Sequence, residues 1–116
     1  MSDRYTRTDA ENALERLAAA LGKPLGHYRK LRGGEVSTFG SDTYTTIPGG
    51  WALDYNPTYG GCVIEEIDDR GGTSVRRPLG DRRMSPREFV DSVWFALNAI
   101  ELYRRPQSTP ARSDTL

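Results

Sequence analysis

Four glycine pairs divide the middle of this 116-residue chain into short segments. They are Gly33-Gly34, Gly49-Gly50, Gly60-Gly61 and Gly71-Gly72. Glycine reaches positive φ without a Cβ clash, so pairs at such spacing mark tight reversals between short strands. The pattern therefore predicts an antiparallel β-meander.

The segments between these pairs favour extended structure. In "WALDYN", residues 51–56, large side chains alternate with small or polar ones, as in a half-buried strand. Residues 62–67 and 73–77 supply the next two strands, and a turn at Gly71-Gly72 would set Glu66 near Arg77 and Ile67 near Arg76. For residues 23–50 we expect a loop followed by one irregular strand.

A helix is predicted on each side of the meander. Thr8 and Glu11 stand at capping-box spacing, and the apolar residues that follow recur every three or four positions, which predicts a helix over residues 9–21. A second helix begins at Ser85, with Pro86 at its first position and Glu88 completing another capping box. We expect its broad apolar arc to contribute most to the core: Phe89, Val90, Val93, Trp94, Ala96, Leu97 and Ile100.

The predicted fold class is therefore α+β, in the order helix, three or four antiparallel strands, helix. Both helices are expected on one face of the sheet. Residues 1–105 form a single domain in this interpretation. Residues 106–116 contain two prolines and no large apolar residue before Leu116, so they are predicted to be a disordered tail.

Composition narrows the classes of function. The 16 basic and 16 acidic residues cancel, so no global charge attracts the chain to nucleic acid or an anionic membrane. Cys62 is the only cysteine, which excludes an internal disulfide and suits a reducing compartment. The first residues are charged and no apolar run is long enough to span a bilayer, so we expect a soluble cytoplasmic protein without membrane contact.

The sequence offers few groups for chemistry. His27 is the only histidine, and no base can be placed beside a nucleophile from the sequence. Glu65 and Glu66 are adjacent on a predicted strand and point to opposite faces, so they do not converge on a metal ion. Glycine loops that bind phosphate are missing. We therefore predict no catalytic residues, metal or cofactor, and a protein that is not an enzyme.

Charge is nevertheless segregated along the chain. Residues 51–69 hold five acids and no base, whereas residues 70–87 hold six arginines and one acid. One interpretation is mutual neutralisation across the hairpin. The alternative is a nucleic-acid site, since the arginines at the second helix N-terminus are expected to lie beyond the acidic strand's reach. Its candidate residues are Arg82, Arg83, Arg87, Lys23, Arg29, Lys30 and Arg32.

Candidate partner-binding residues lie on the second helix. Phe95 and Leu102 fall two turns apart on its polar side, beside Asp91, and fit a partner surface or a homodimer seam. The alternative is burial under residues 23–48 or under the tail. Trp51 and Tyr55 are assigned to the core, whereas Tyr59, in a turn, is expected to be exposed and is a further candidate partner-binding residue.

Two resemblances bear on function. The element order resembles a double-stranded-RNA-binding domain, although "RRMSPRE" replaces that family's lysine-rich second helix start. Residues 49–100, with "GGWALDYNPTYGG", "VIEEI" and "RMSPREFVDSVWFALNAI", are similar to small uncharacterised proteins of actinobacterial bacteriophages. That likeness implies a phage accessory role in the host cytoplasm and transfers no site residues. The sequence thus predicts a non-enzymatic protein that acts by contacting a host protein or itself, with nucleic-acid binding as the alternative.

Overall fold

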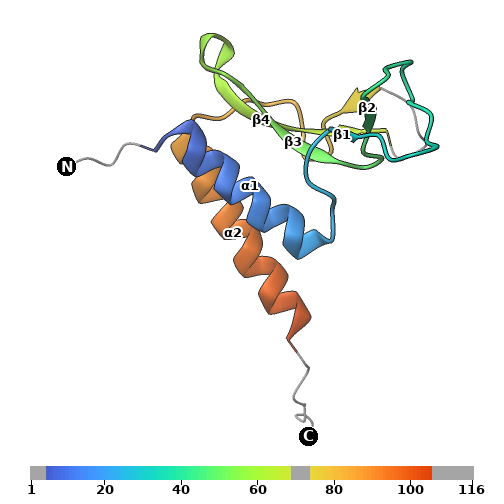
Figure 1. Ribbon diagram of the computed structural model, residues 1–116. Helices are drawn as coiled ribbons and strands as arrows, with labels where there is room; N and C mark the ends of the chain where they lie inside the picture. The colour runs from blue at the N-terminus through green and yellow to red at the C-terminus, as the bar shows by residue number, and fades with distance from the viewer. Residues whose placement is uncertain (1–4, 69–73, 106–116) are drawn as a thin grey trace, which may run out of the picture.

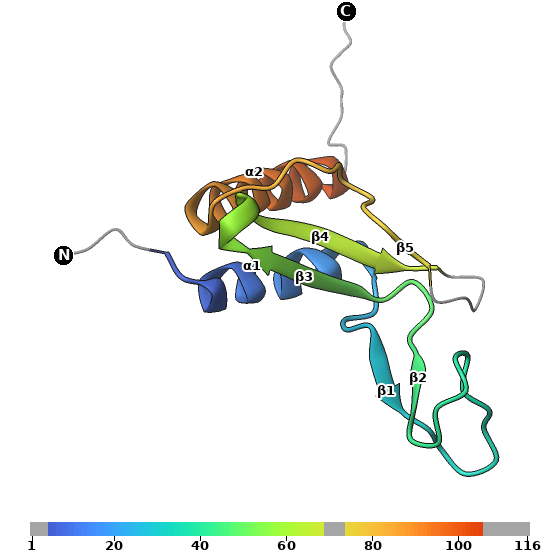
Figure 2. The ribbon, with the colours of Figure 1, turned by 90° about the horizontal axis from the view of Figure 1, so that it is seen from above.

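The computed structural model describes residues 5–68 and 74–105, and it has an α+β fold (Figure 1). The elements in chain order are α1 (Arg7–Leu21), β1 (Tyr28–Lys30), β2 (Tyr44–Thr46), β3 (Trp51–Asn56), η1 (Pro57–Tyr59), β4 (Gly61–Ile67), β5 (Val75–Arg76) and α2 (Pro86–Arg104). Both helices lie on the same face of the sheet formed by β3, β4 and β5 (Figure 2). The predicted fold class is confirmed. The predicted tail and the Gly71-Gly72 turn lie outside the described residues.

Helix α1 begins two residues earlier than predicted. Its N-cap is Thr6, which forms a reciprocal capping box with Asp9, so the predicted box of Thr8 and Glu11 is wrong. The earlier start places Arg7 one turn before Glu11, and the two side chains pair at 3.1 Å. The predicted end is correct, because Gly22 adopts the left-handed conformation that caps the helix.

Helix α2 begins as predicted, with Ser85 accepting a hydrogen bond from the Glu88 backbone N–H. The Glu88 carboxylate does not complete the predicted capping box, because it accepts a hydrogen bond from the Arg82 side chain instead. Five residues of α1 and three of α2 are buried, and three further residues of α2 pack against the core while partly exposed: Ala96, Leu97 and Ile100. Trp94, at the edge of the predicted apolar arc, is 47% exposed to solvent, and the Arg16 guanidinium lies over its ring.

The core lies between the two helices and the inner face of β3 and β4. Trp51, Leu53 and Tyr55 point toward it from β3, as their alternation predicted. The fully buried members are Ala10, Ala13, Leu14, Leu17, Ala18, Trp51, Cys62, Ile64, Phe89, Val90 and Val93. Burial of these side chains supplies the main driving force for folding.

The 23–50 segment contains two strands and not the single irregular strand predicted. β1 and β2 pair antiparallel in a separate two-stranded sheet, with Tyr28 opposite Thr46 and Lys30 opposite Tyr44. This hairpin projects from one end of the larger sheet (Figure 2). The chain returns to β3 through Gly50, where a Cβ would overlap the Gly26 carbonyl oxygen, so a glycine is required there.

The third strand of the main sheet is short and its register differs from the prediction. Glu66 pairs with Arg76 and Ile67 with Val75, one residue away from the predicted partners Arg77 and Arg76. Continued in the same register, Pro78 would face Ile64, and proline has no N–H for the ladder. The strand ends at Arg76, and the chain rejoins β4 only where Met84 and Cys62 exchange backbone hydrogen bonds of 2.6 and 2.9 Å.

Neither helix in the described part of the chain combines the length and the apolar character required to span a bilayer.

Candidate interaction surfaces

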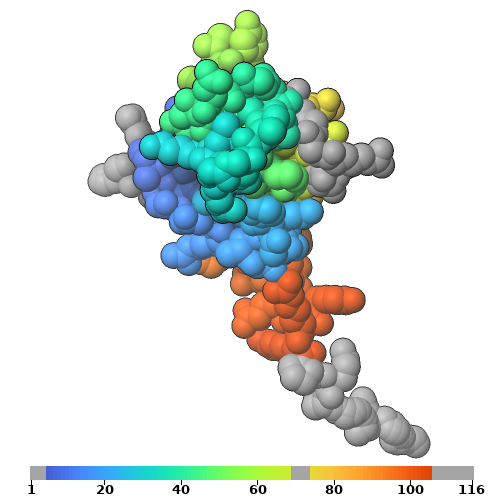
Figure 3. Space-filling view, turned by 45° about the vertical axis from the view of Figure 1, so that its right-hand side comes forward, coloured from blue at the N-terminus to red at the C-terminus, as the bar shows by residue number. Residues whose placement is uncertain are grey.

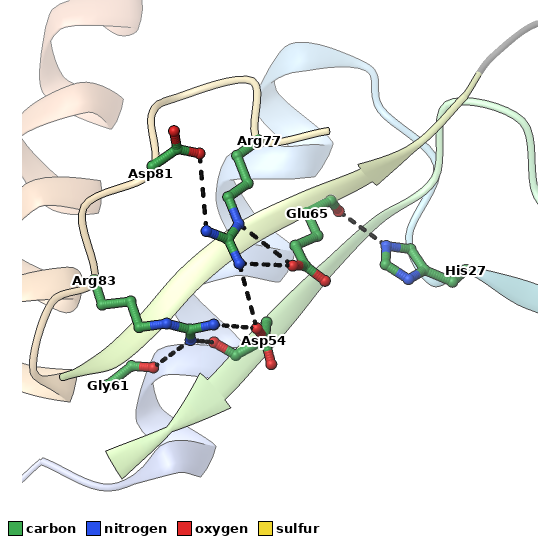
Figure 4. A network of polar contacts seen from close by, with 7 residues as sticks. All are labelled: His27, Asp54, Gly61, Glu65, Arg77, Asp81 and Arg83. Carbon is green, nitrogen blue, oxygen red and sulfur yellow. Dashed lines mark hydrogen bonds and ion pairs between the residues drawn. The ribbon is translucent and has the colours of Figure 1, made fainter. Parts of the chain in front are cut away.

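The acidic and basic segments neutralise each other on the outer face of the sheet, away from the helices (Figure 4). Arg77 pairs with Glu65 at 3.3 Å and approaches Asp54 and Asp81 within 3.9 Å. Arg83 donates to the Asp54 carboxylate and to the backbone carbonyls of Asp54 and Gly61. These ion pairs agree with the interpretation that the two segments neutralise each other.

This geometry corrects the nucleic-acid prediction at the start of α2. Arg83 was expected to lie beyond the acidic strand's reach, but its side chain is largely buried and forms an ion pair with Asp54. Arg82 is bound to Glu88 at 2.6 Å, and this hydrogen bond holds the pKa of the Glu88 carboxyl below its usual range. Of the three candidates there, Arg87 is exposed and takes no part in these two ion pairs.

The other basic segment divides in the same way. Arg29 binds Glu35 through two hydrogen bonds of 2.9 and 2.8 Å, and Lys23 pairs with the buried Glu66 at 3.3 Å. Lys30, the last residue of β1, and Arg32, two residues later, are both exposed. In Figures 1 and 2, β1 and the start of α2 lie at opposite ends of the main sheet, so the two basic segments do not merge into one surface.

The predicted partner residues on α2 are exposed. Phe95 is 77% and Leu102 is 66% exposed, and Asp91 and Ala99 share their side of the helix. The 23–48 segment does not cover them, which removes one of the alternatives. Cover by the tail lies outside the described residues. We call Phe95, Ala99 and Leu102 the α2 stripe. The C-terminal end of α2 extends beyond the end of α1 (Figure 3).

The aromatic residues of the main sheet divide as expected. Trp51 is buried and Tyr55 is partly buried against the core, whereas Tyr59 is 74% exposed. Tyr59 belongs to η1 at the tip of the β3–β4 hairpin, near the start of α2 (Figure 2). It is therefore accessible, but at a different place from the α2 stripe.

The groups considered for chemistry hold structural positions. His27 Nε2 lies 2.9 Å from the Glu65 carbonyl oxygen, which ties the β1 segment to β4. Cys62 is buried in the core, and burial raises the pKa of its thiol against the opposing charges of Arg83 and Arg7. Within residues 5–68 and 74–105, no three His, Cys, Asp or Glu side chains gather as a metal site.

A cavity of about 80 Å³ lies between the 79–84 segment, β4 and α2. Its walls are mainly apolar, with Leu17, Ile64, Leu79, Met84 and Phe89 among them. Arg82 and Ser92 add polar groups to the lining, and the largely apolar wall suits packing or a small apolar group.

One exposed surface was missed from the sequence. Tyr28, Phe39 and Tyr44 line an open hollow on the β1–β2 hairpin and are between 44% and 57% exposed. The signal was the alternation in "HYRK" and "DTYTT", which places an aromatic residue on one face of each strand. It was hidden because the two strands are only three residues long.

Comparison with known proteins adds no functional assignment. No protein-family model matches the chain, and no curated protein or solved structure is significantly similar to it.

Proposed function

We propose that this chain is a small non-enzymatic protein that acts by protein contact through the α2 stripe. The supporting observation is a phenylalanine and a leucine, both mostly exposed, stacked on one side of a helix whose opposite side is buried in the core. Exposed apolar side chains gathered in this way are typical of protein interfaces. The resemblance to bacteriophage proteins supports a role as an accessory protein in the host cytoplasm.

The partner that fits best is a second copy of the chain, with the two α2 helices antiparallel. In a two-fold interface, if residue i contacts residue j then j contacts i. A two-fold axis between Asn98 and Ala99 brings Phe95 against the other copy's Leu102 twice. Ala99 is small and exposed, so the two helix backbones can approach closely at the axis.

Charge supports the same orientation. The antiparallel arrangement sets Asp91 beside the other copy's Arg105, an attractive pair on each side of the apolar contact. In a parallel arrangement, each of these charges would meet its own kind. Rim charges of this sort select orientation more than they add affinity.

Sedimentation measured over a range of concentrations tests the proposal. The wild type is expected to self-associate, and Phe95→Asp and Leu102→Asp are expected to be monomeric with an unchanged far-UV spectrum, because both side chains are exposed. Tyr59→Asp is the matched control, since it also adds a charge at an exposed aromatic residue but lies outside the stripe.

A charge swap tests the orientation. Asp91→Arg and Arg105→Asp are each expected to weaken the dimer, and the double variant is expected to restore it. A wild type that stays monomeric at every concentration would overturn self-association. If Phe95→Asp then abolished capture of a host protein, the stripe would be retained and its partner would be a different molecule.

A further inference from the structure

Three aromatic rings form an open platform on the β1–β2 hairpin, apart from the α2 stripe. Tyr28 comes from β1, Tyr44 from β2 and Phe39 from the loop between them. The hollow that they line has a volume of about 390 Å³. In the described residues no other side chain lines it. The 28–46 segment forms a lobe of its own on this side of the molecule (Figure 3).

The platform is held in place by hydrogen bonds beneath it. The Tyr28 and Phe39 rings meet edge to face at 5.6 Å, and the His27 ring continues the row at 6.3 Å. His27 is fixed by the Glu65 carbonyl oxygen of β4. Next to Phe39, Thr38 is tied to β2 by bonds of 3.1 and 2.8 Å to Thr45 and Thr46. The rings are thus presented on an ordered base.

The platform carries positive charge. Lys30 is directly opposite Tyr44 and two residues after Tyr28, so all three side chains share one face of the hairpin. Arg32 follows at the end of β1. Of the two acids in this lobe, Glu35 is already bound by Arg29, whose hydrogen bond and that of the Arg32 backbone N–H lower its pKa to about 2. Asp42 is the other acid.

We propose that this platform binds single-stranded nucleic acid, with bases stacked on Tyr28, Phe39 and Tyr44 and phosphates contacted by Lys30 and Arg32. Exposed aromatic rings interleaved with cations are the recurring arrangement for single strands, because every base has a face to stack. In a duplex those faces are hidden between neighbouring base pairs. A methylammonium ligand also suits an aromatic hollow, but it would meet the Lys30 charge on the same face.

Fluorescence anisotropy with labelled twelve-nucleotide single strands tests this site. Oligo-dT and oligo-rU are expected to bind at low salt, and comparing them shows whether the ribose matters. Single substitutions Tyr28→Ala, Phe39→Ala and Tyr44→Ala are each expected to weaken binding roughly 5- to 150-fold. Tyr44→Leu is expected to weaken binding as well, because leucine keeps apolar contact but offers no ring to stack.

Salt dependence tests the phosphate contacts. For two phosphate contacts, the slope of log K against the logarithm of the salt concentration is expected to be about −1.4. Lys30→Ala should reduce the magnitude of this slope by about 0.7. Tyr59→Ala is the control for an exposed tyrosine elsewhere, and unchanged thermal melting of the platform variants shows that the fold is intact. Absence of binding to either strand at low salt would overturn the proposal. The proposal would also be overturned if the three alanine variants bound the single strands as tightly as the wild type does. Binding of a proline-rich peptide in place of the oligonucleotides would overturn it too.

Discussion

Glu66 has the most unusual environment of any charged residue in the described chain. It is 1% exposed, accepts a hydrogen bond of 2.8 Å from the Trp51 indole, and pairs with Arg76 and Lys23. Burial raises the pKa of its carboxyl, but the bonds from Trp51, Arg76 and Lys23 together outweigh burial and lower it. A buried charge of this kind is tolerated only because every donor is in place.

We therefore predict that Glu66→Ala lowers the free energy of unfolding by about 1 to 3 kcal/mol, since it leaves the buried Trp51 indole N–H without its acceptor. Glu66→Gln is expected to lose less, because its amide oxygen still accepts from Trp51. Chemical denaturation followed by circular dichroism measures both. Glu65→Gln, on the opposite face of β4, is the control and should cost about 1 kcal/mol or less. An equal loss for Glu65→Gln and Glu66→Ala would contradict this account.

At the scale of the element, the start of α1 is set by a choice between two caps. Both Thr6 with Asp9 and Thr8 with Glu11 have the required spacing, and only the first pair forms the box. The earlier cap adds a helical residue, Arg7, that pairs with Glu11 and lies over the Tyr55 ring at 5.7 Å. The contact with Tyr55 joins distant parts of the chain and cannot be predicted from the local pattern.

Thr6→Ala is accordingly predicted to lower the free energy of unfolding by about 1 kcal/mol, the usual loss of an N-cap. Thr8→Ala should change it by less than about 0.5 kcal/mol, because Thr8 lies inside the helix and caps nothing. Thermal denaturation of the two variants side by side compares the caps. A larger loss from Thr8→Ala would restore the later start.

The helices and the main sheet could be predicted from the sequence because their patterns repeat over several turns or strand residues. β1 and β2 could not, since three residues each give no usable period and thirteen residues separate them. The predicted β4–β5 register was wrong by one position, since Glu66 pairs with Arg76 and Ile67 with Val75. In a strand, that one position moves a side chain to the other face, so Arg76 and not Arg77 reaches Glu66.

The candidate sites show the same division. Exposure of Phe95, Leu102 and Tyr59 followed from their places on a helix and in a turn, which are local properties. The pairing of Arg83 with Asp54 joins residues 29 positions apart and depends on how the 77–84 segment crosses the sheet. The aromatic platform needs both a strand pair and a loop in place, so only the fold reveals it.

For the whole molecule, ion pairs predict how stability depends on pH. The carboxyl pKa values of Glu35, Glu66 and Glu88 are all lowered in the folded state, to about 2 for Glu35. Between these values and the ordinary value near 4.5, the unfolded chain binds more protons than the folded one. The stabilisation is therefore complete above about pH 5 and is lost as the pH falls toward 2.

Urea denaturation at pH 7, 5, 4 and 3 measures this dependence. The free energy of unfolding is expected to be highest at the upper two values and to decrease at pH 4 and 3. Glu66→Gln should show a shallower decrease, because the group that titrates at that position has been removed. Stability that stays level or rises between pH 5 and pH 3 would contradict the prediction.

The interruption of the third strand at Pro78 has a consequence for how copies of this protein meet. A strand from another molecule needs an unbroken row of backbone groups to add to a sheet. On β4, Glu66 pairs with Arg76, and the backbone of Cys62 is hydrogen-bonded to Met84. On β3, the backbone of Trp51 is hydrogen-bonded to Pro24 and Gly26. Fibrous growth by strand addition is thereby disfavoured.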